Sequence, residues 1–257
     1  MSDGQMKLAL VTGGVRRIGA HIAGRLADAG YDLALHGHSD ADPEDELARK
    51  LKSNDTTWSG FVADFGCDGA AVGLLAAVSQ KFGRMPDLLV NNASVFEYDD
   101  ASSLSDESLE KHLKINMMVP TLLTTMLARE VPKDKRAAVI NIIDQRVRNP
   151  NGDQLSYTLS KQALAESVRS LAVACADNLR VNGIAPGLTL ATGDYSDDQM
   201  DRLATNMPLN QLSSPDDIAD AALYLAQAET VTGQILFVDG GAHMKSFDRD
   251  FMFMERH

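Results

Sequence analysis

Short apolar runs alternate with amphipathic stretches along the chain, and this alternation limits the possible folds more than any other feature. The runs have the length of strands buried on both faces of a sheet, and they lie at residues 7–12, 32–36, 58–63, 88–91, 137–143, 180–184 and 235–238. Strands that alternate with helices form a parallel sheet covered by helices on both faces. The chain is therefore predicted to have an α/β fold, a doubly wound domain with a seven-stranded parallel sheet.

Helices are predicted in the stretches between these strands. In the first of them Ile18, Ile22 and Leu26 repeat every four residues, which places them on one helix face. The predicted helices span residues 18–29, 43–52, 70–82, 157–177 and 215–226, and one runs from the capping Ser105 to about residue 130. Residues 186–214 are expected to be partly irregular. Since no linker-like stretch or repeat divides residues 1–257, we expect a single domain that ends in a tail, residues 244–257.

Composition and charge exclude several classes of protein. Hydrophobic residues make up 44% of the chain, charged residues 23%, and the net charge is −12 without a block of Lys or Arg, which disfavours nucleic acid and anionic membranes. No apolar run approaches the roughly 18 residues that cross a bilayer, and residues 1–14 resemble a first strand rather than a secretory signal. Cys67 and Cys175 lack metal-ligand spacing. We expect a cytoplasmic protein without a bound metal, a nucleic-acid partner or a membrane segment.

A glycine-containing turn follows the first predicted strand and leads into the first predicted helix. It reads TGGVRRIG, residues 12–19. Small residues let the backbone approach a pyrophosphate, and the free N–H groups at the start of a helix favour an anion. The turn therefore predicts a Rossmann-type dinucleotide site, with contacts from Gly13, Arg17, Ile18 and Gly19.

The end of the second strand indicates which dinucleotide binds. A protein that reads the ribose 2′-hydroxyl of NAD usually carries an acid there, whereas this strand ends in His36, Gly37, His38 and Ser39. Arg16 and Arg17 add positive charge nearby, which suits a 2′-phosphate. We therefore expect NADP(H) as the cofactor, bound through Arg17, His36, His38 and Ser39, although Asp40 places one acid close by.

Tyr157 and Lys161 are four residues apart and hence lie on one face of a predicted helix. A lysine there is expected to lower the pKa of the phenol and to make it a proton donor near neutral pH. This pair is common by chance, but further motifs accompany it at the ends of other strands. They are Asn91-Asn92-Ala93, Asn116 in a helix, Pro186-Gly187 and Asp239-Gly240-Gly241.

With these motifs the chain resembles the short-chain dehydrogenase/reductase family over residues 6–243. The resemblance implies catalytic roles for Asn116, Tyr157 and Lys161, with Tyr157 as the acid and Lys161 also on the nicotinamide ribose. Pro120 lacks the N–H that would bond the Asn116 carbonyl, and in the family that carbonyl holds a water. The resemblance also implies cofactor contacts from Asp64, Asn92, Ala93, Ser94, Tyr157, Lys161, Pro186, Gly187, Leu188 and Thr189.

Two departures from the family pattern resemble the pteridine reductases. Asp144 stands where the family usually has a serine, and Arg17 replaces the second glycine of the turn. A carboxylate only accepts hydrogen bonds, so it suits a substrate with N–H donors, such as an amino-pyrimidinone ring. The expected substrate contacts are Arg17, Ser94, Phe96, Asp144 and Tyr157, with Phe96 as a stacking face.

Three functions are consistent with these motifs. The leading prediction is an NADPH-dependent reductase of a pterin or dihydropterin, in which Asp144 also takes part in the chemistry. A carbonyl reductase, including one for 3-oxoacyl thioesters, is the alternative, and Asp144 argues against it. A non-catalytic NADP-binding sensor would not need Asn116, Tyr157 and Lys161. Family members are commonly tetramers or dimers, so we expect a homo-oligomer whose apolar tail reaches a neighbouring active site.

Overall fold

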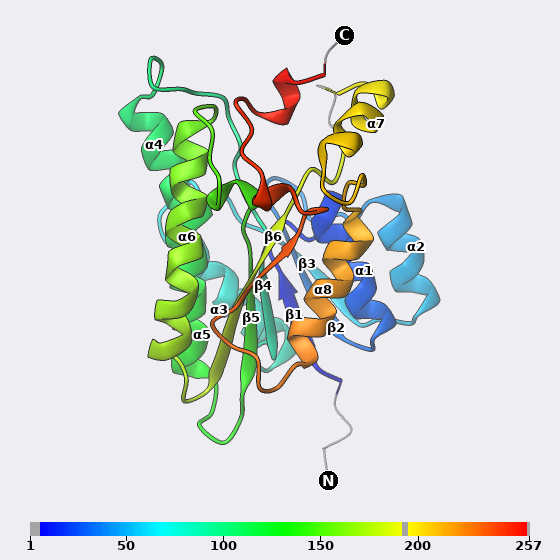
Figure 1. Cartoon of the computed structure of the whole chain (residues 1–257). Coiled ribbons are helices and arrows are strands. Elements are labelled where there is room, and N and C mark those ends of the chain that lie inside the picture. Colours follow the sequence, from blue (N-terminus) through cyan, green and yellow to red (C-terminus); the bar gives the residue numbers. More distant parts are fainter. Residues whose placement is uncertain (1–5, 192–194, 256–257) are drawn as a thin grey trace.

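The seven predicted strands pair in one parallel sheet with the order β3-β2-β1-β4-β5-β6-β7 (Figure 1). The computed structural model describes residues 6–191 and 195–255. The strands are β1 (Leu8–Val11), β2 (Asp32–Gly37), β3 (Trp58–Val62), β4 (Leu88–Asn91), β5 (Ala137–Ile142), β6 (Leu179–Pro186) and β7 (Ile235–Val238). The winding direction reverses between β1 and β4, and in such sheets ligands bind beyond the carboxyl ends of the strands at that point.

Helices cover both faces of the sheet, which confirms the predicted fold class. One face carries α1 (Arg17–Asp28), α2 (Asp45–Ser53) and α8 (Pro215–Gln227). The other carries α3 (Ala70–Phe82), α5 (Val119–Glu130) and α6 (Leu155–Ala174), with α4 (Asp106–Leu113) packed against α6 (Figure 1). None of the described helices is long and apolar enough to cross a membrane.

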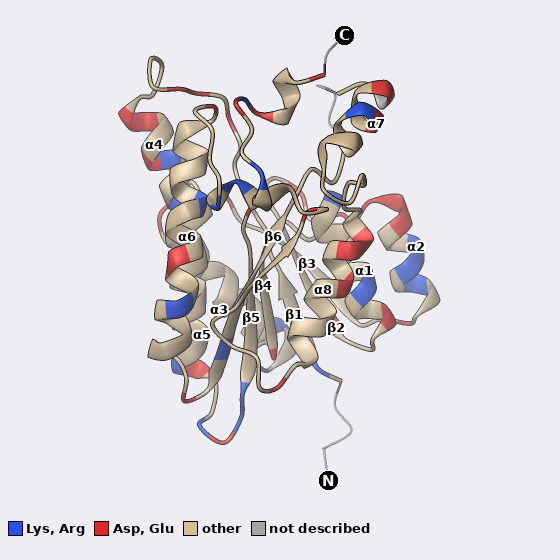
Figure 2. Ribbon diagram, viewed as in Figure 1, with Lys and Arg blue, Asp and Glu red and all other residues tan. Residues whose placement is uncertain are grey.

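The strand β1 shows why the sheet is buried on both faces. Leu8 and Leu10 lie in the core under α3 and α5, whereas Ala9 and Val11 lie in the core under α1 and α8. All four side chains are fully buried. The charged residues lie mainly on the helices and loops, and the strands are almost free of them (Figure 2). An uninterrupted apolar run is therefore the expected sequence of such a strand.

The predicted helix after Ser105 differs from the structure. Ser105 does cap α4, since its hydroxyl accepts the Ser108 N–H. However, a π-helical turn, η1 (Lys114–Met118), separates α4 from α5, and within it the Val119 N–H donates to the Lys114 carbonyl five residues back. Such a turn contains one residue more than a regular α-helical turn, so apolar periodicity does not reveal it.

The segment between β6 and α8 also contains a helix that was not predicted. It is α7 (Asp197–Asn206), which Ser196 caps by accepting the Gln199 N–H. The helix is mostly polar, and its buried Leu203 packs against Met207 and Phe251. Only a narrow apolar stripe marks this helix, so the sequence pattern there is weak.

The C-terminal tail lies over its own chain rather than extending away from it (Figure 1). Two short 3₁₀ turns, η3 (Ala242–Met244) and η4 (Phe251–Phe253), lead it back above the carboxyl ends of the strands. The buried Phe251 packs against Leu203 of α7. The expected contact of the tail with a neighbouring subunit stays a prediction, and residues 256–257 of that tail lie outside the described residues.

Candidate active site

The turn between β1 and α1 leaves no room for side chains at its glycines. A Cβ on Gly19 would lie 2.0 Å from the Gly13 carbonyl oxygen, and Gly13 itself has a φ of 59°. Arg17 also has a positive φ, 55°, at the position where the family usually has glycine. The N-cap residue Arg16 makes no side-chain cap, the first turn of α1 contains no acidic residue, and Glu44 accepts the Arg17 N–H at 3.2 Å. The remaining N–H groups at this helix start favour an anion such as a pyrophosphate.

Polar contacts tie this turn to the end of β4. The Thr12 hydroxyl accepts the backbone N–H groups of Asn92 at 2.9 Å and Ala93 at 3.0 Å. The Asn92 side-chain amide donates to the Thr12 and Gly13 carbonyls, both at 3.0 Å. The structure therefore brings the predicted cofactor residues after β4 directly beside the glycine turn.

The placement of His36 corrects its predicted role. The ring is buried, Nδ1 accepts the Gly13 N–H at 3.1 Å, and Nε2 donates to the Ala63 carbonyl at 2.9 Å. Burial also lowers the pKa of the imidazole, which favours the neutral ring. With both nitrogens used inside the protein, His36 holds the glycine turn and does not present a cation to a phosphate.

His38 and Ser39, which follow β2, are more accessible to a ligand than His36. His38 and Ser39 are exposed, and His38 lies 3.5 Å from Asp64, the expected adenine contact. Asp40 forms an ion pair with Arg16 at 2.7 Å. Asp40 is the acid near the end of β2 that would favour NAD as the cofactor. Its charge is neutralised by Arg16 of the glycine turn.

Asp144, Tyr157 and Lys161 meet at the carboxyl end of β5. The Tyr157 hydroxyl donates to Asp144 Oδ2 at 2.9 Å, and Lys161 Nζ donates to the Ile142 carbonyl at 2.9 Å. Tyr157 and Lys161 are buried, one turn apart on α6. The sequence motif thus forms a compact group in which the unusual carboxylate is bonded directly to the phenol.

The pKa values of this group correct the expected electrostatics. Burial, followed by the Asp144 carboxylate, raises the pKa of the Tyr157 phenol well above its ordinary value. Burial lowers the pKa of Lys161 to about 8, against a smaller opposing effect of Asp144. We expected Lys161 to lower the phenol pKa, but burial and the neighbouring carboxylate prevail and keep Tyr157 protonated as a hydrogen-bond donor.

Asn116 lies in the middle of the π-helical turn and is fully buried. Its amide nitrogen donates to the Val95 carbonyl at 2.9 Å and to Ser160 Oγ at 3.0 Å. Its amide oxygen accepts the Val95 N–H at 2.8 Å and the Ser94 hydroxyl at 3.1 Å. The side chain therefore joins the segment after β4, which includes the predicted Ser94, to α6.

Phe96 and Arg17, two further predicted substrate contacts, lie in different parts of the site. Phe96 is half exposed, and its ring meets the Tyr157 ring edge-on with centroids 4.7 Å apart. The Arg17 side chain is exposed in the glycine turn, where its backbone N–H donates to Glu44. Phe96 thus belongs to the Tyr157 group, and Arg17 belongs to the cofactor turn.

The predicted cofactor residues after β6 contact other parts of the chain. Gly187 packs against Asp239, and Leu188 packs in the cluster that contains Phe251. The Thr189 hydroxyl donates to the Gly187 carbonyl.

Arg146 is a site residue that the sequence analysis missed. It lies in a short 3₁₀ turn, η2 (Gln145–Val147), which Asp144 caps by accepting the Arg146 N–H at 2.8 Å. The buried guanidinium lies over the rings of Tyr157 and Phe96, at 5.3 and 5.7 Å from their centroids. An arginine two residues after a predicted catalytic carboxylate was the only local signal for it.

Comparisons with known proteins agree with this arrangement. A family model described as enoyl-(acyl carrier protein) reductase matches residues 13–243. The structure of FolM alternative dihydrofolate reductase 1 from Brucella suis, in complex with NADP, is 34% identical with a TM-score of 0.87, and the alignment covers 94% of this chain and 96% of that chain. The 3alpha-hydroxysteroid dehydrogenase of Mediterraneibacter gnavus is 31% identical over 92% of this chain and 96% of its own length.

A third relative, the 3-oxoacyl-(acyl carrier protein) reductase FabG of Staphylococcus epidermidis, is 26% identical over 93% of this chain and 99% of its own length. The chain belongs to the short-chain dehydrogenase/reductase family. It is accordingly an oxidoreductase.

In residues 6–191 and 195–255, no group of three or more His, Cys, Asp or Glu side chains is arranged to hold a metal ion.

Proposed function

We propose that this oxidoreductase reduces a C=N bond in a pterin or dihydropterin ring with NADPH. The observation that carries the proposal is the hydrogen bond between the Tyr157 hydroxyl and the Asp144 carboxylate, at 2.9 Å. The family usually has a serine in place of this carboxylate, so a carboxylate beside the phenol indicates a different kind of substrate.

The turn and the strand ends fit NADP(H), and the chain is an NADP-dependent enzyme of its family. The tight approach of Gly19 to Gly13 and the helix start that follows it suit a pyrophosphate. The ion pair of Arg16 with Asp40 removes the acid that would favour an NAD ribose. Two solved relatives that are 34% identical are in complex with NADP. Bound NADPH supplies the hydride.

The residues around Tyr157 suit a flat ring with N–H donors. Asp144 is 21% exposed on its side chain, so its carboxylate is accessible to a substrate while it bonds to Tyr157. An ionised carboxylate accepts hydrogen bonds from an amino-pyrimidinone, and the half-exposed Phe96 offers an aromatic face. Tyr157 holds its proton against ionisation and can deliver it to a ring nitrogen, directly or through Asp144. The Brucella suis relative is named an alternative dihydrofolate reductase, and this name supports the same class of substrate.

A carbonyl reductase remains the alternative, because several relatives are named for ketone or 3-oxoacyl reduction. The Tyr157 hydroxyl alone can donate to a carbonyl oxygen. The Asp144 carboxylate beside it would repel the negative charge that develops on that oxygen. The structure of the site therefore favours the heterocycle over the ketone.

Substitution of Asp144 separates the two functions. Asp144→Ser should reduce pterin turnover by roughly 10², the size of one general acid–base contribution, and should keep or raise ketone turnover. Asp144→Asn keeps the size of the side chain but places an N–H₂ donor against substrate donors, so it should bind pterin less tightly than the wild type. Single-turnover hydride transfer is measured for all three proteins with a dihydropterin and with a simple ketone. Preference of the wild type for the ketone, with pterin turnover unchanged in the variants, would replace this proposal by the alternative.

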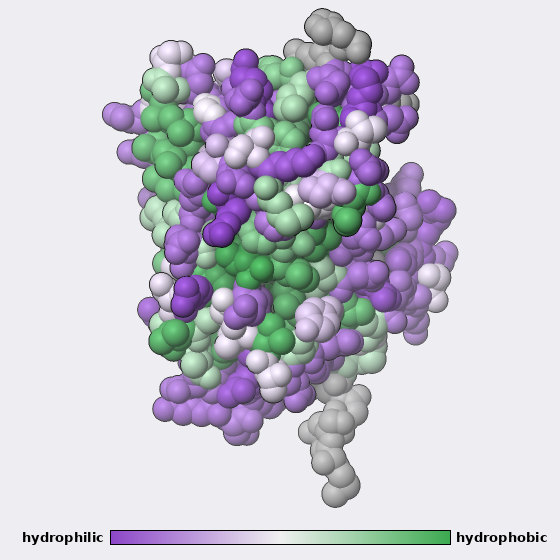
Figure 3. Space-filling model, viewed as in Figure 1, coloured by the Kyte–Doolittle hydropathy of each residue, from purple (hydrophilic) through white to green (hydrophobic). Residues whose placement is uncertain are grey.

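We also propose a homo-oligomer and a cytoplasmic location. Strand β7 is the edge of the sheet, and hydrophobic residues gather in the middle of the face that includes it, between α6 and α8 (Figure 3). Leu236 of β7 is 38% exposed, and a second copy of the chain would cover this surface. Light scattering of the purified protein tests the association. Both cysteines, Cys67 and Cys175, are free, as is usual for a protein of a reducing compartment.

A further inference from the structure

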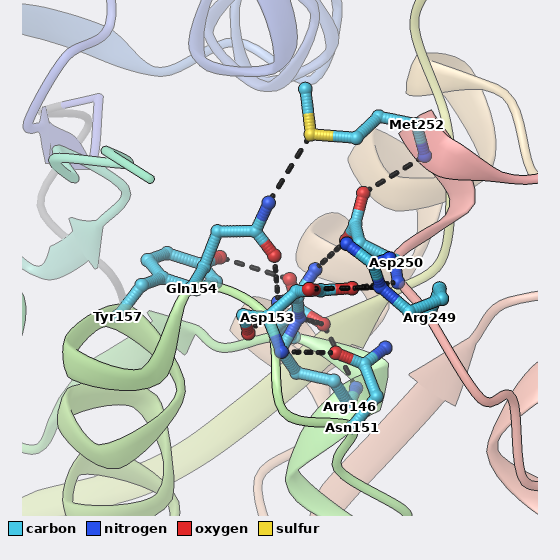
Figure 4. Close-up of polar contacts among 9 residues, drawn as sticks. Arg146, Asn151, Asp153, Gln154, Tyr157, Arg249, Asp250 and Met252 are labelled. Atoms are coloured by element: carbon cyan, nitrogen blue, oxygen red, sulfur yellow. Dashed lines mark hydrogen bonds and ion pairs between the residues drawn. The ribbon is translucent and has the colours of Figure 1, made fainter. Parts of the chain in front are cut away.

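A buried network of charges joins the C-terminal tail to the active site (Figure 4). The Arg146 guanidinium forms an ion pair with Asp250 of the tail through Nη2, and its Nη1 donates to the side chain of Gln154 at 3.0 Å. The Arg146 and Asp250 side chains are 7% and 5% exposed. Charges at such depth require partners, so the two residues depend on each other although 104 positions separate them.

The tail is attached to the same region by further contacts. Asp153 Oδ2 accepts the Asp250 backbone N–H at 2.8 Å and pairs with Arg249 at the same distance. The Gln154 side chain donates to the sulfur of Met252 at 3.2 Å (Figure 4). Gln154 is buried and has a φ of 47°, a conformation that side chains rarely adopt. Strained residues persist where their surroundings hold them, and here Arg146 and the tail hold the residue that precedes α6.

The opposite side of Arg146 faces the catalytic carboxylate. Asp144 Oδ1 accepts the Arg146 backbone N–H at 2.8 Å, and Nε lies 3.5 Å from the same oxygen. This distance is too long for a good hydrogen bond, and Arg146 Nε is buried without a hydrogen-bond partner among the described residues. The unused N–H therefore lies beside the carboxylate that Tyr157 must release when its hydroxyl turns to a substrate.

We propose that Arg146 is a positioning residue of the reductase site, which fixes the Asp144 carboxylate, and that Asp250 of the C-terminal tail holds Arg146 in place. The tail is then a working part of its own chain's active site. The proposal rests on the proposed function in one respect, because it assigns Asp144 a role in reduction. The placement of the carboxylate itself can be measured without any substrate.

Titration of Lys161 reports where the carboxylate lies. The titratable groups near its ammonium are Asp144, which raises its pKa, and the phenol of Tyr157, which is uncharged. The pKa of Lys161 is about 8. The probe is the ¹³C signal of the Lys161 side chain followed by NMR against pH, and it is assigned as the signal that Lys161→Ala removes.

Three variants test the positioning role in this titration. Asp144→Asn removes the carboxylate and should lower the pKa of Lys161. Arg146→Lys keeps the charge but loses the planar fork of donors, so any shift it causes comes from displacement of the carboxylate. We expect Arg146→Lys and Asp250→Asn to lower the pKa of Lys161 in the direction of Asp144→Asn. The double variant Arg146→Gln/Asp250→Asn removes both buried charges together and should give the same shift if either single variant fails to fold.

Arg249→Gln is the matched control. It removes an ion pair that ties the same tail to Asp153, but the Arg249 side chain is 53% exposed, unlike the buried Arg146. We expect this variant to leave the titration of Lys161 unchanged. An unchanged titration in Arg146→Lys and Asp250→Asn, or an equal shift in Arg249→Gln, would overturn the proposal.

Kinetics then test whether Arg146 acts through Asp144. With a dihydropterin, Arg146→Lys should lower kcat/KM by about tenfold, because a small misplacement of a reacting group is costly, and NADPH affinity should not change. In the Asp144→Asn background the same change should cause no further loss. A full additional loss in that background would contradict the positioning role. Failure of the wild type to reduce any dihydropterin would overturn the proposed function alone, since the titration of Lys161 decides the position of the carboxylate separately.

Discussion

At the end of β1, the cofactor turn is held by uncharged side chains, whereas at the end of β5 the reacting groups are held by buried charges, one of them from the C-terminal tail. Thr12, Asn92 and His36 fix the turn through neutral hydrogen bonds. Asp144 and Arg146 depend on Asp250, which lies 104 residues beyond Arg146. Substitutions in the first region should therefore act on cofactor binding, and those in the second should act on the chemical step.

The largest expected effect separates the two regions most clearly. Tyr157→Phe removes one hydroxyl from the substrate region and should lower turnover by about 10² to 10⁴, because the proton donor is lost. The affinity for NADPH should stay at the wild-type value, since the glycine turn is untouched. Stopped-flow hydride transfer and a fluorescence titration with NADPH measure the two quantities. Near-normal turnover would assign the proton to another group.

The pH dependence of reduction tests the buried charge of Lys161. Because burial lowers its pKa to about 8, the ammonium is present below that pH and is lost as the pH rises through it. The rate of reduction should therefore decline above about pH 8, by roughly tenfold for each further pH unit. Lys161→Arg keeps its charge to much higher pH and should remove this decline. A wild-type rate that stays constant well above this pH would show that the cation is not needed.

The preference for NADPH over NADH tests the cofactor region. With Arg17, His38 and Ser39 facing the 2′-phosphate, NADPH should bind at least about tenfold more tightly, which is about 1.4 kcal/mol. The preference should shrink at high salt, because exposed charge pairs are screened. Titrations with both cofactors at two ionic strengths measure it. Equal affinities would remove the basis of the assignment.

The smallest expected effect concerns the exposed pair of Arg16 and Asp40. Arg16→Ala should change the free energy of unfolding by less than about 1 kcal/mol, because both side chains are near half exposed. It should nevertheless lower the preference for NADPH, by about two- to threefold, since the freed carboxylate would repel the 2′-phosphate. The double variant Arg16→Ala/Asp40→Asn is the control and should regain the preference. Urea unfolding and cofactor titration measure the two effects.

The fold could be predicted because each strand is a separate apolar run, as β1 illustrates with four fully buried residues. The cofactor region could be predicted because its residues follow one another within short motifs. His36 shows the limit of such motifs, because a histidine at this position suits a contact with a phosphate as well as a hydrogen bond that holds the turn. Burial alone decides that it holds the turn, and burial depends on how Phe65 and Ala63 pack around it.

The substrate region was predicted only in part. Asp144, Tyr157 and Lys161 stand in one motif, but the contact of Arg146 with Asp250 joins segments that only the folded chain brings together. The apolar residues of the tail predicted that its end is buried, but they did not indicate which surface covers it. The buried Phe251 packs with Leu203, in a helix whose own pattern is weak.

The π-helical turn at Lys114–Met118 limits how this sequence can change in length. Loops accept insertions and deletions, but removal of one residue here would restore regular helix and rotate α4 against α5 by about 100°. His112 of α4, which contacts Ser156 at the start of α6, would then turn away from the helix that carries Tyr157. A single-residue deletion in this turn should thus be tolerated far less than one in the loops, and descendants of this enzyme are expected to keep the length of this helix constant while their loops diverge.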